Sequence, residues 1–260
     1  MTDRSPFSCW QPGVCAALLS EARRSVSSIE TLHADLAPPS DAEAYHVQSL
    51  ILKDSGDVIG GWKVGAKGSD APINGGLLPA QGIHPSGVTL ALEDFTWVGL
   101  ELEIAFLLNQ DFLASAAPYS EAEVLGSIEF MLPTIEVVTS RIRPNPENPR
   151  RWAMADLLNH GALIVGEPIP YDPSYPFLSP SLTWTFNGDN IAPAETGSNP
   201  AGDPRRLLAW TVNHCCQQGW DFKREMLITA GTFTGVFKPT QAGHALGSFA
   251  ELGSISLTLR

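Results

Sequence analysis

The hydrophobic pattern of the chain changes in character near residue 59. Before that point, apolar residues recur at helical spacing from Val14 to Leu36 and from Asp41 to Leu52, and Ser40 stands where it can cap the second helix. Beyond it, short apolar runs are broken by glycine and proline, a texture typical of strands and turns. The pattern predicts a helical N-terminal cap region at 1–58 and a β-rich domain at 59–260, which together form one structural unit.

The β-rich part is expected to contain strands and two further helices. Asp203 and Pro204 predict the start of a helix that runs to Cys216 and ends at Gly219. A shorter helix is expected within Glu121–Phe130. At least six strands are expected beyond residue 90, at Trp97–Leu108, Thr134–Val138, Ala162–Gly166, Leu182–Phe186, Leu227–Ala230 and Ser254–Leu259. These elements predict a mixed α+β fold.

Composition and charge narrow the class of protein. The 260 residues are 43% hydrophobic and 17% charged, with 23 glycines and 21 prolines, as in a globular, loop-rich protein. Asp and Glu outnumber Lys and Arg by 28 to 16, so the net charge is −12, and this argues against a nucleic-acid partner. Because the sequence has neither a long apolar stretch nor a signal-peptide pattern, a cytoplasmic protein is expected. The 4 cysteines match no zinc or redox spacing and are expected to be reduced thiols.

Two carboxylates, Glu101 and Glu103, lie inside an apolar run. In a strand, residues two apart point to the same face, so both would project together from a segment whose neighbours are typical of a core. A third carboxylate, Glu136, lies in a second apolar run. Like charges on a half-buried face need a positive partner, which predicts a divalent metal, a lysine or an arginine among them. The alternative for each glutamate is a solvated position at a strand edge.

An all-oxygen, anionic site favours Mg²⁺, Mn²⁺ or Ca²⁺ over zinc. Such an ion can accept both oxygens of a 2-keto acid and stabilise the enolate that forms from it. Lys63, between Gly61 and Gly65, is the second candidate for chemistry. It is interpreted either as an ion-pair partner of a buried carboxylate, or as a proton-transfer group, or as an ordinary surface lysine.

Several short motifs, taken in order, resemble one family. This is the fumarylacetoacetate hydrolase superfamily, and within it the 2-keto-4-pentenoate hydratase and 4-oxalocrotonate decarboxylase branch. The resemblance runs from about Ala44 to the C-terminus. It is carried by AYHVQ at 44–48, GWKVG at 61–65, ELEIAF at 101–106, IEVVTSR at 135–141, ADLLN at 155–159, GDP at 202–204 and TAGTFTG at 229–235.

The resemblance implies a β-rich mixed roll or barrel of the fumarylacetoacetate hydrolase type with a helical N-terminal cap, which makes 59–260 the catalytic domain. It implies one divalent cation per subunit, Mg²⁺ or Mn²⁺. The residues that match the family's functional positions are Glu101, Glu103 and Glu136 as metal ligands, Lys63 as the catalytic group, and Gly231, Thr232, Asn159 and Leu78 for substrate binding.

The chain also departs from the family's pattern. The serine of an A-D-N-A-S segment is missing after Asp156, and an aspartate that follows the lysine motif has no clear equivalent. His160 and His84 are candidate replacements, although a lone histidine more often has a structural role. These departures leave the substrate and the proton-transfer partners open.

The activity that the resemblance implies is a metal-dependent hydro-lyase of aromatic-compound catabolism. It would add water to a 2-hydroxy-2,4-dienoate of the 2-keto-4-pentenoate type, through a metal-bound enolate, to give a 4-hydroxy-2-keto acid. The alternatives are decarboxylation of a 2-keto-3-enedioate of the 4-oxalocrotonate type, hydrolytic C–C cleavage of an acylpyruvate, and a non-catalytic subunit partner. The implied partners are a small 2-keto acid, further copies of the chain in a dimer or a multiple of dimers, and a sister decarboxylase or hydratase.

Overall fold

The computed structural model describes residues 10–30, 36–143 and 149–260. The helices are α1 (Pro12–Arg24), α2 (Asp41–Ser55), α3 (Glu121–Gly126), α4 (Pro149–Ala155) and α5 (Arg206–Gln217), with short 3₁₀ turns η2 (Ala80–Gly82), η3 (Leu92–Asp94) and η4 (Leu157–Asn159). The strands are β1 (Ile59–Gly65), β2 (Asn74–Pro79), β3 (Ile83–Pro85), β4 (Val88–Leu90), β5 (Gly99–Leu108), β6 (Ile128–Val138), β7 (His160–Val165), β8 (Ile169–Pro170), β9 (Leu182–Phe186), β10 (Asp189–Asn190), β11 (Leu227–Thr232), β12 (Gly243–Phe249) and β13 (Gly253–Leu259).

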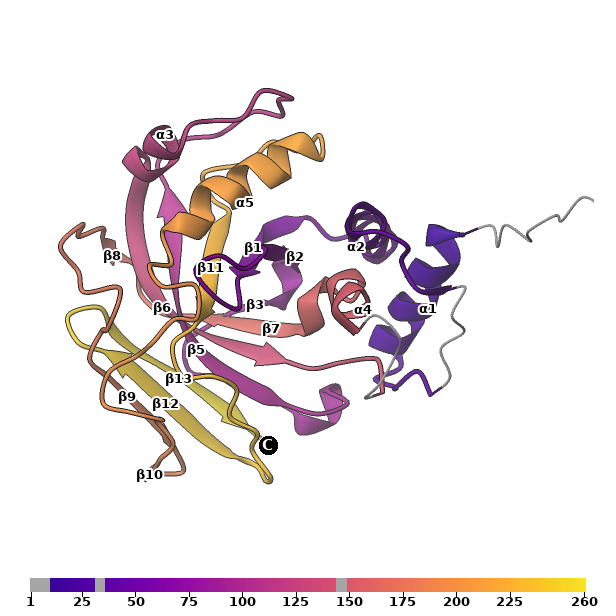
Figure 1. The fold of residues 1–260 in the computed structure, drawn as a ribbon. Coiled ribbons are helices and arrows are strands. Elements are labelled where there is room, and N and C mark those ends of the chain that lie inside the picture. Colours follow the sequence, from indigo (N-terminus) through magenta and orange to yellow (C-terminus); the bar gives the residue numbers. More distant parts are fainter. Residues whose placement is uncertain (1–9, 31–35, 144–148) are drawn as a thin grey trace, which may run out of the picture.

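The strands form a large curled sheet and a smaller one. In the large sheet the order is β2-β1-β11-β5-β6-β7-β3, with β8 paired to β6; in the small sheet it is β10-β9-β12-β13-β4. The small sheet packs through β12 and β13 against β6 and β7, while α1, α2 and α4 pack together on the other side of the molecule (Figure 1). The mixed α+β fold with N-terminal helices, expected from the sequence, is confirmed.

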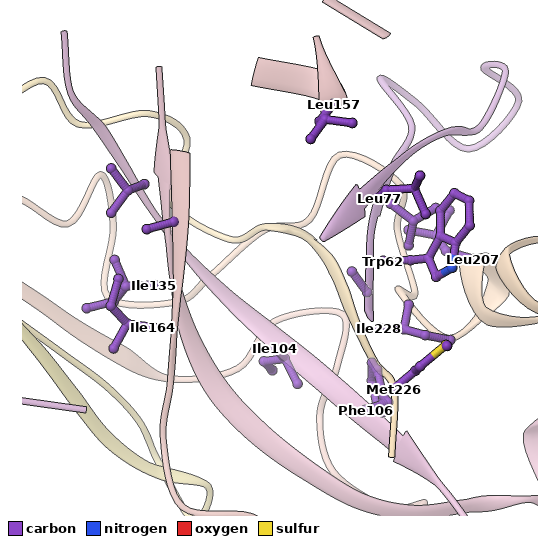
Figure 2. Packing of buried hydrophobic residues seen from close by; sticks show 14 of the residues in the cluster. Trp62, Leu77, Ile104, Phe106, Ile135, Leu157, Ile164, Leu207, Met226 and Ile228 are labelled. Carbon is purple, nitrogen blue, oxygen red and sulfur yellow. The ribbon is translucent and has the colours of Figure 1, made fainter. Parts of the chain in front are cut away.

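The two faces of the large sheet carry different kinds of side chain. One face is fully apolar: Trp62 of β1 and Ile228 of β11 lie close to Leu207 of α5 (Figure 2). Because side chains alternate along a strand, Lys63 and Thr229 project from the opposite face. Within the motif 61–65, Trp62 thus packs β1 into the core, and Lys63 projects from the other face of the sheet.

A small apolar layer shares the face of the sheet with Lys63. Its buried members come from five different strands and are Leu78, Ala105, Leu132, Leu163 and Leu227. Ala105 pairs with Leu132 across the β5–β6 ladder, one side-chain step from Glu103. This layer, the apolar floor of the site, therefore flanks the polar residues of the same face and shields that side of them from solvent.

Some predicted boundaries moved. The helix predicted at Val14–Leu36 ends at Arg24, since Val26 adopts a left-handed φ of 48°, and part of the predicted span (31–35) lies outside the described residues. The helix predicted within Glu121–Phe130 ends at Gly126 because Ile128 already pairs with Leu108 as part of β6. Tertiary pairing of β5 and β6 thus overrides the helical pattern there.

The N-cap predicted for α2 is observed, whereas the residue predicted to cap α5 caps the turn before it. The hydroxyl of Ser40 accepts a hydrogen bond from the Glu43 amide at 3.2 Å, as expected for an N-cap of α2. Asp203 instead caps a turn ahead of α5, accepting from the Arg205 amide at 3.0 Å, and the helix itself begins at Arg206.

Cys15, Cys215 and Cys216 are buried free thiols, while Cys9 lies outside the described residues. Within the described ranges, none of the helices is long and apolar enough to cross a membrane.

Candidate metal and substrate site

The three glutamates singled out in the sequence converge on one point of the large sheet. β5 and β6 are antiparallel neighbours in a register that sets Glu101 directly opposite Glu136, and Glu103 follows one side-chain step along β5. One carboxylate oxygen from each residue lies within 4.8 Å of the others. Glu103 and Glu136 are only 3% and 1% exposed, whereas Glu101 is half-buried. The solvated-edge alternative therefore does not describe these residues.

Burial raises the pKa of all three carboxyl groups. For Glu101 the loss of solvent, followed by repulsion from Glu136 and opposed by the ammonium of Lys63, raises the pKa to about 7. For Glu103 the same loss of solvent and the charges of its two neighbours raise the pKa well above its usual value. Loss of solvent also raises the pKa of Glu136, although Lys63 opposes it. The cluster is thus short of positive charge.

Lys63 supplies one cation to this cluster. Its side chain is buried, and Nζ donates hydrogen bonds to the carboxylate of Glu136 and, at 2.9 Å, to the carbonyl oxygen of Leu158. Of the three roles that the sequence left open for Lys63, that of ion-pair partner of a buried carboxylate fits this geometry. A single lysine cannot balance three carboxylates, and an all-oxygen anionic donor set is what a hard divalent cation binds. The residues present therefore fit such an ion.

Two threonines form a hydrogen-bonded series that ends on the carboxylate of Glu103. The hydroxyl of Thr229 donates to Oε2 of Glu103 at 2.5 Å, and its oxygen lies 3.0 Å from the hydroxyl of Thr134. Both threonines are fully buried. These hydrogen bonds fix the rotamer of the Glu103 carboxylate and leave its other oxygen, Oε1, for the cluster.

The carbonyl that binds Lys63 is presented by an unusual turn. Leu157, Leu158 and Asn159 have consecutive left-handed φ values of 52°, 51° and 60°. A Cβ on Gly76 would lie 2.8 Å from the carbonyl oxygen of Leu157, so β2 can approach this turn only with glycine at that position. The backbone strain of non-glycine residues in this region has to be held by the surrounding structure.

A buried ion-pair network supports the turn. Arg141 Nε lies 2.8 Å from Asp156 Oδ2, and Arg23 Nη2 lies 3.1 Å from Asp156 Oδ1. Arg23 also donates to the carbonyl oxygen of His160 at 3.2 Å. Arg141 and Asp156 belong to sequence motifs, but their spacing of 15 residues has no local period, so the sequence offered no signal that they pair.

The carboxylates open into a cavity of about 240 Å³. Its wall is lined by Lys63, Val64, Gly65, Ala66, Lys67, Asn74, Glu101, Glu103, Glu136, Leu158, Asn199, Pro200, Gly231 and Thr232. Gly231 has a φ of 78°, and the side-chain amide of Asn199 donates to the carbonyl oxygens of Ala230 and Gly231 at 2.8 and 3.0 Å. Asn199 thereby fixes the turn that brings Gly231 and Thr232 to the wall.

The structure brings most of the sequence-predicted residues together, but not all. Leu78 lies in the apolar floor, and Asn159 lies next to Leu158 without lining the cavity. His160 is buried with Nδ1 at 3.7 Å from Glu136, and burial holds its pKa well below the usual value. His84, on β3, does not line the cavity. The lining residues that sequence reasoning missed include Lys67, Asn74 and Asn199, which no motif had marked.

Comparison with known proteins finds relatives that are hydratases. No family model matches it. It is 24% identical over 258 residues to a 2-keto-4-pentenoate hydratase of Paraburkholderia phymatum, covering 92% of this chain and 94% of the relative. It is also 24% identical to the TodF product hydratase of Pseudomonas putida F1, covering 93% of this chain and 92% of the relative.

Solved structures share the fold over nearly the whole chain. The 4-oxalocrotonate decarboxylase of Pseudomonas putida G7, complexed with magnesium and adipate, superposes with a TM-score of 0.82 at 20% identity, covering 96% of this chain and 97% of that one. The fumarylpyruvate hydrolase of Pseudomonas aeruginosa, in complex with Mn²⁺ and pyruvate, superposes less closely, with a TM-score of 0.54 at 14% identity, covering 76% of this chain and 88% of that one.

Proposed function

We propose that this chain belongs to the hydratase and decarboxylase branch of the fumarylacetoacetate hydrolase superfamily and is a divalent-metal-dependent hydratase of a 2-hydroxy-2,4-dienoate. The observation that carries the proposal is the convergence of Glu101, Glu103 and Glu136 beside Lys63 in one cavity. Two curated hydratases match over 92% and 93% of this chain, which supports hydration over the other reactions of the superfamily.

Glu101, Glu103 and Glu136 would hold the cation, which fits Mg²⁺ or Mn²⁺ by the chemistry of its ligands. When bound, the ion supplies Lewis-acid stabilisation of negative charge on the 2-oxo end of the substrate. Thr229 keeps Glu103 in place for this role. The apolar floor under the cluster excludes water and strengthens the electrostatic interactions at the site.

Lys63 is the group that we assign to proton transfer. An ammonium has three N–H donors, and two of them are used by Glu136 and the Leu158 carbonyl among the described residues. The third is available to a molecule in the cavity. Glu136 accepts a hydrogen bond from Nζ and thereby orients the ammonium.

The turn at Gly231 and Thr232 is assigned to the substrate carboxylate. Both residues line the cavity, and Asn199 holds the turn in its left-handed conformation. In the proposed reaction the dienol takes a proton at its terminal carbon and gives up its enol O–H proton, which leaves a 2-oxo acid with one C3–C4 double bond. The elements of water then add across that double bond, giving a 4-hydroxy-2-keto acid. No group leaves, so the substrate gains one water in total.

The reaction is tested by assaying the purified, Mn²⁺-supplemented protein on three substrate types. Loss of the ultraviolet absorbance of 2-hydroxypenta-2,4-dienoate, with formation of the 4-hydroxy-2-keto acid seen by NMR, is the expected result. Release of CO₂ from 4-oxalocrotonate without hydration of the dienoate would replace the proposal by decarboxylation. Turnover of an acylpyruvate alone, or of none of the three, would contradict both.

Decarboxylation of a 2-keto-3-enedioate is the second candidate function. It is favoured by one specific observation, namely that decarboxylase structures share the fold with TM-scores of 0.81 and 0.82 over 96% of this chain. Both reactions need the same groups at the 2-oxo end, so they are separated by product analysis rather than by the site.

Metal affinity should rise with pH through neutrality. In the metal-free protein the pKa of Glu101 is raised to about 7 and that of Glu103 is raised well above its usual value, so protons occupy the cluster at lower pH and a cation must displace them. We expect the affinity for Mn²⁺ to fall by roughly tenfold for each pH unit below 7 per proton displaced. Isothermal titration at pH 6 and pH 8, in two buffers of different ionisation enthalpy, measures both the affinity and the proton release. An affinity that does not change with pH would contradict the raised carboxyl pKa values.

A further inference from the structure

We propose that the protein has a second ligand site, at which Arg23 and Arg141 bind a small tetrahedral oxyanion such as phosphate or sulfate. The site is a cavity of about 90 Å³ whose wall includes Arg23, Asp94, Thr96, Thr139 and Arg141. None of the described residues that line it also lines the cavity of the glutamate cluster. Its ligand is therefore separate from the substrate of that cluster.

This second cavity lies between the end of α1 and three segments of the large sheet. Arg23 is in the last turn of α1, Thr96 precedes β5, Thr139 and Arg141 follow β6, and Gly161 belongs to β7. A cavity of this size has room for a few water molecules or one small ion. It is far smaller than the roughly 300 Å³ or more that an organic ligand of drug size occupies.

The two guanidinium groups at this cavity share one carboxylate. Among the described residues, Asp156 is the only acid within ion-pair distance of either arginine, at 2.8 Å from Arg141 Nε and 3.1 Å from Arg23 Nη2. Arg141 is only 4% exposed and Arg23 is half-buried. Loss of solvent and the charge of Arg141, opposed by Asp156, lower the pKa of Arg23 to about 9. A bound anion would supply the counter-charge that this pair lacks.

Both arginines have N–H groups available for that anion. Arg23 Nε is buried and has no hydrogen-bond partner. Arg141 uses Nε and Nη2 within its ion pair, whereas its Nη1 forms no hydrogen bond with any described residue. The hydroxyls of Thr96 and Thr139 are already engaged, because Thr96 donates to the carbonyl oxygen of Ser140 at 2.7 Å and lies 2.9 Å from Thr139 Oγ1. Recognition therefore depends on the guanidiniums, whose planar set of donors matches the oxygens of an oxyanion.

One residue of the wall, Asp94, opposes an anion. It is exposed, and among the described residues no lysine or arginine lies within ion-pair distance of it. Solvent and salt screen the charge of an exposed carboxylate more than they screen that of a buried guanidinium. Asp94 therefore weakens the attraction of the cavity for an anion without cancelling it.

Arg23 also connects this cavity to the turn that binds Lys63. It donates hydrogen bonds to the carbonyl oxygens of Asp156 at 3.0 Å and His160 at 3.2 Å, the residues that flank Leu157–Asn159. An anion that fixes Arg23 should therefore stabilise the turn that offers the Leu158 carbonyl to Lys63.

Calorimetric titration of the full-length protein with sodium phosphate and with sodium sulfate tests the site. The background salt is potassium gluconate, whose anion is too large for the cavity, and no metal is added. We expect the wild-type protein to bind one oxyanion per chain. Arg23→Gln should weaken this binding by about tenfold or more, because it removes a charged donor. Asp94→Asn should strengthen it by about two- to fivefold, because it removes the opposing charge.

Arg24→Gln is the matched control, since Arg24 is the next residue of α1, is exposed, pairs with Glu21 and does not line the cavity. It should bind phosphate as the wild type does. Thermal unfolding of each variant shows whether it is folded, and saturating phosphate should raise the Tm of the wild type more than that of Arg23→Gln.

Absence of oxyanion binding by the wild type would overturn the second site. Binding that persists unchanged in Arg23→Gln, or that weakens equally in Arg24→Gln, would also overturn it, because the anion would then bind elsewhere or only through the overall charge. If Arg23→Gln does not fold, Asp94→Asn decides alone, and an affinity equal to that of the wild type would refute the site.

Discussion

Glu103→Gln is expected to abolish divalent-cation binding and, in the same protein, to raise the stability of the metal-free form. Glu103 is 3% exposed, and its folded-state pKa lies well above the ordinary value of 4.5. A group whose pKa is raised on folding stabilises the protein fully only below the unfolded pKa, and this stabilisation is lost as pH rises. At pH 8 the folded protein therefore has to keep a proton on Glu103 or bury its charge, and the neutral amide removes this cost.

The gain should be about 1–3 kcal/mol in the free energy of unfolding, or several degrees in Tm, at pH 8 and much smaller at pH 5. Thermal unfolding in EDTA at the two pH values measures it, and calorimetric titration with Mn²⁺ measures the lost binding. Glu129→Gln is the control, because Glu129 is an exposed glutamate on β6 and the chemical change is identical. A Glu103→Gln protein that binds Mn²⁺ normally, or that is less stable than wild type in EDTA at pH 8, would refute the assignment.

Lys63→Met is expected to lose activity but keep metal binding, unlike Glu103→Gln, which should lose metal binding. Removing the proton-transfer group should lower kcat by roughly 10²- to 10⁴-fold. Because the ammonium of Lys63 competes with a cation for Glu136, its removal leaves the cluster more negative. We therefore expect Mn²⁺ to bind as tightly as in wild type, or more tightly, at pH 8.

Steady-state kinetics and calorimetric titration of the same preparation measure the two effects of Lys63→Met, with Lys53→Met as the control for loss of an exposed lysine. Loss of metal binding in step with activity would show that Lys63 acts by maintaining the cluster rather than by transferring a proton. Retention of full kcat would remove Lys63 from the reaction altogether. Together with Glu103→Gln, the two variants separate the ligand role from the acid–base role.

The sequence was most informative where the signal was local. That Glu101 and Glu103 lie on the same face of their strand follows from strand alternation alone. Ser40 was placed correctly as the N-cap of α2 because capping depends on residues three apart. Helix ends were less accurate. The helix predicted from Val14 to Leu36 ends at Arg24 in the structure, whereas the shorter helix predicted within Glu121–Phe130 lies within that range, at Glu121–Gly126.

The remaining parts of the site depend on pairs that are distant in the chain. Arg141 and Asp156 appeared in motifs without any sign that they form a buried ion pair beneath the turn at Leu158. Lys67 and Asn74 carried no motif at all, yet they line the cavity. Leu78 was expected at the substrate, whereas the structure places it in the apolar floor.

The sequence by itself determined which residue types are available for chemistry, namely three glutamates in apolar runs and a lysine between glycines, and which strand face each one occupies. It did so because alternation and residue type are local properties. Only the tertiary structure decided that Glu136 faces Glu101, that Leu158 offers its carbonyl to Lys63, and that Asn199 holds the turn at Gly231. These outcomes depend on strand register and on the path of the connecting turns, which are set by packing between residues far apart in the chain and leave no local pattern.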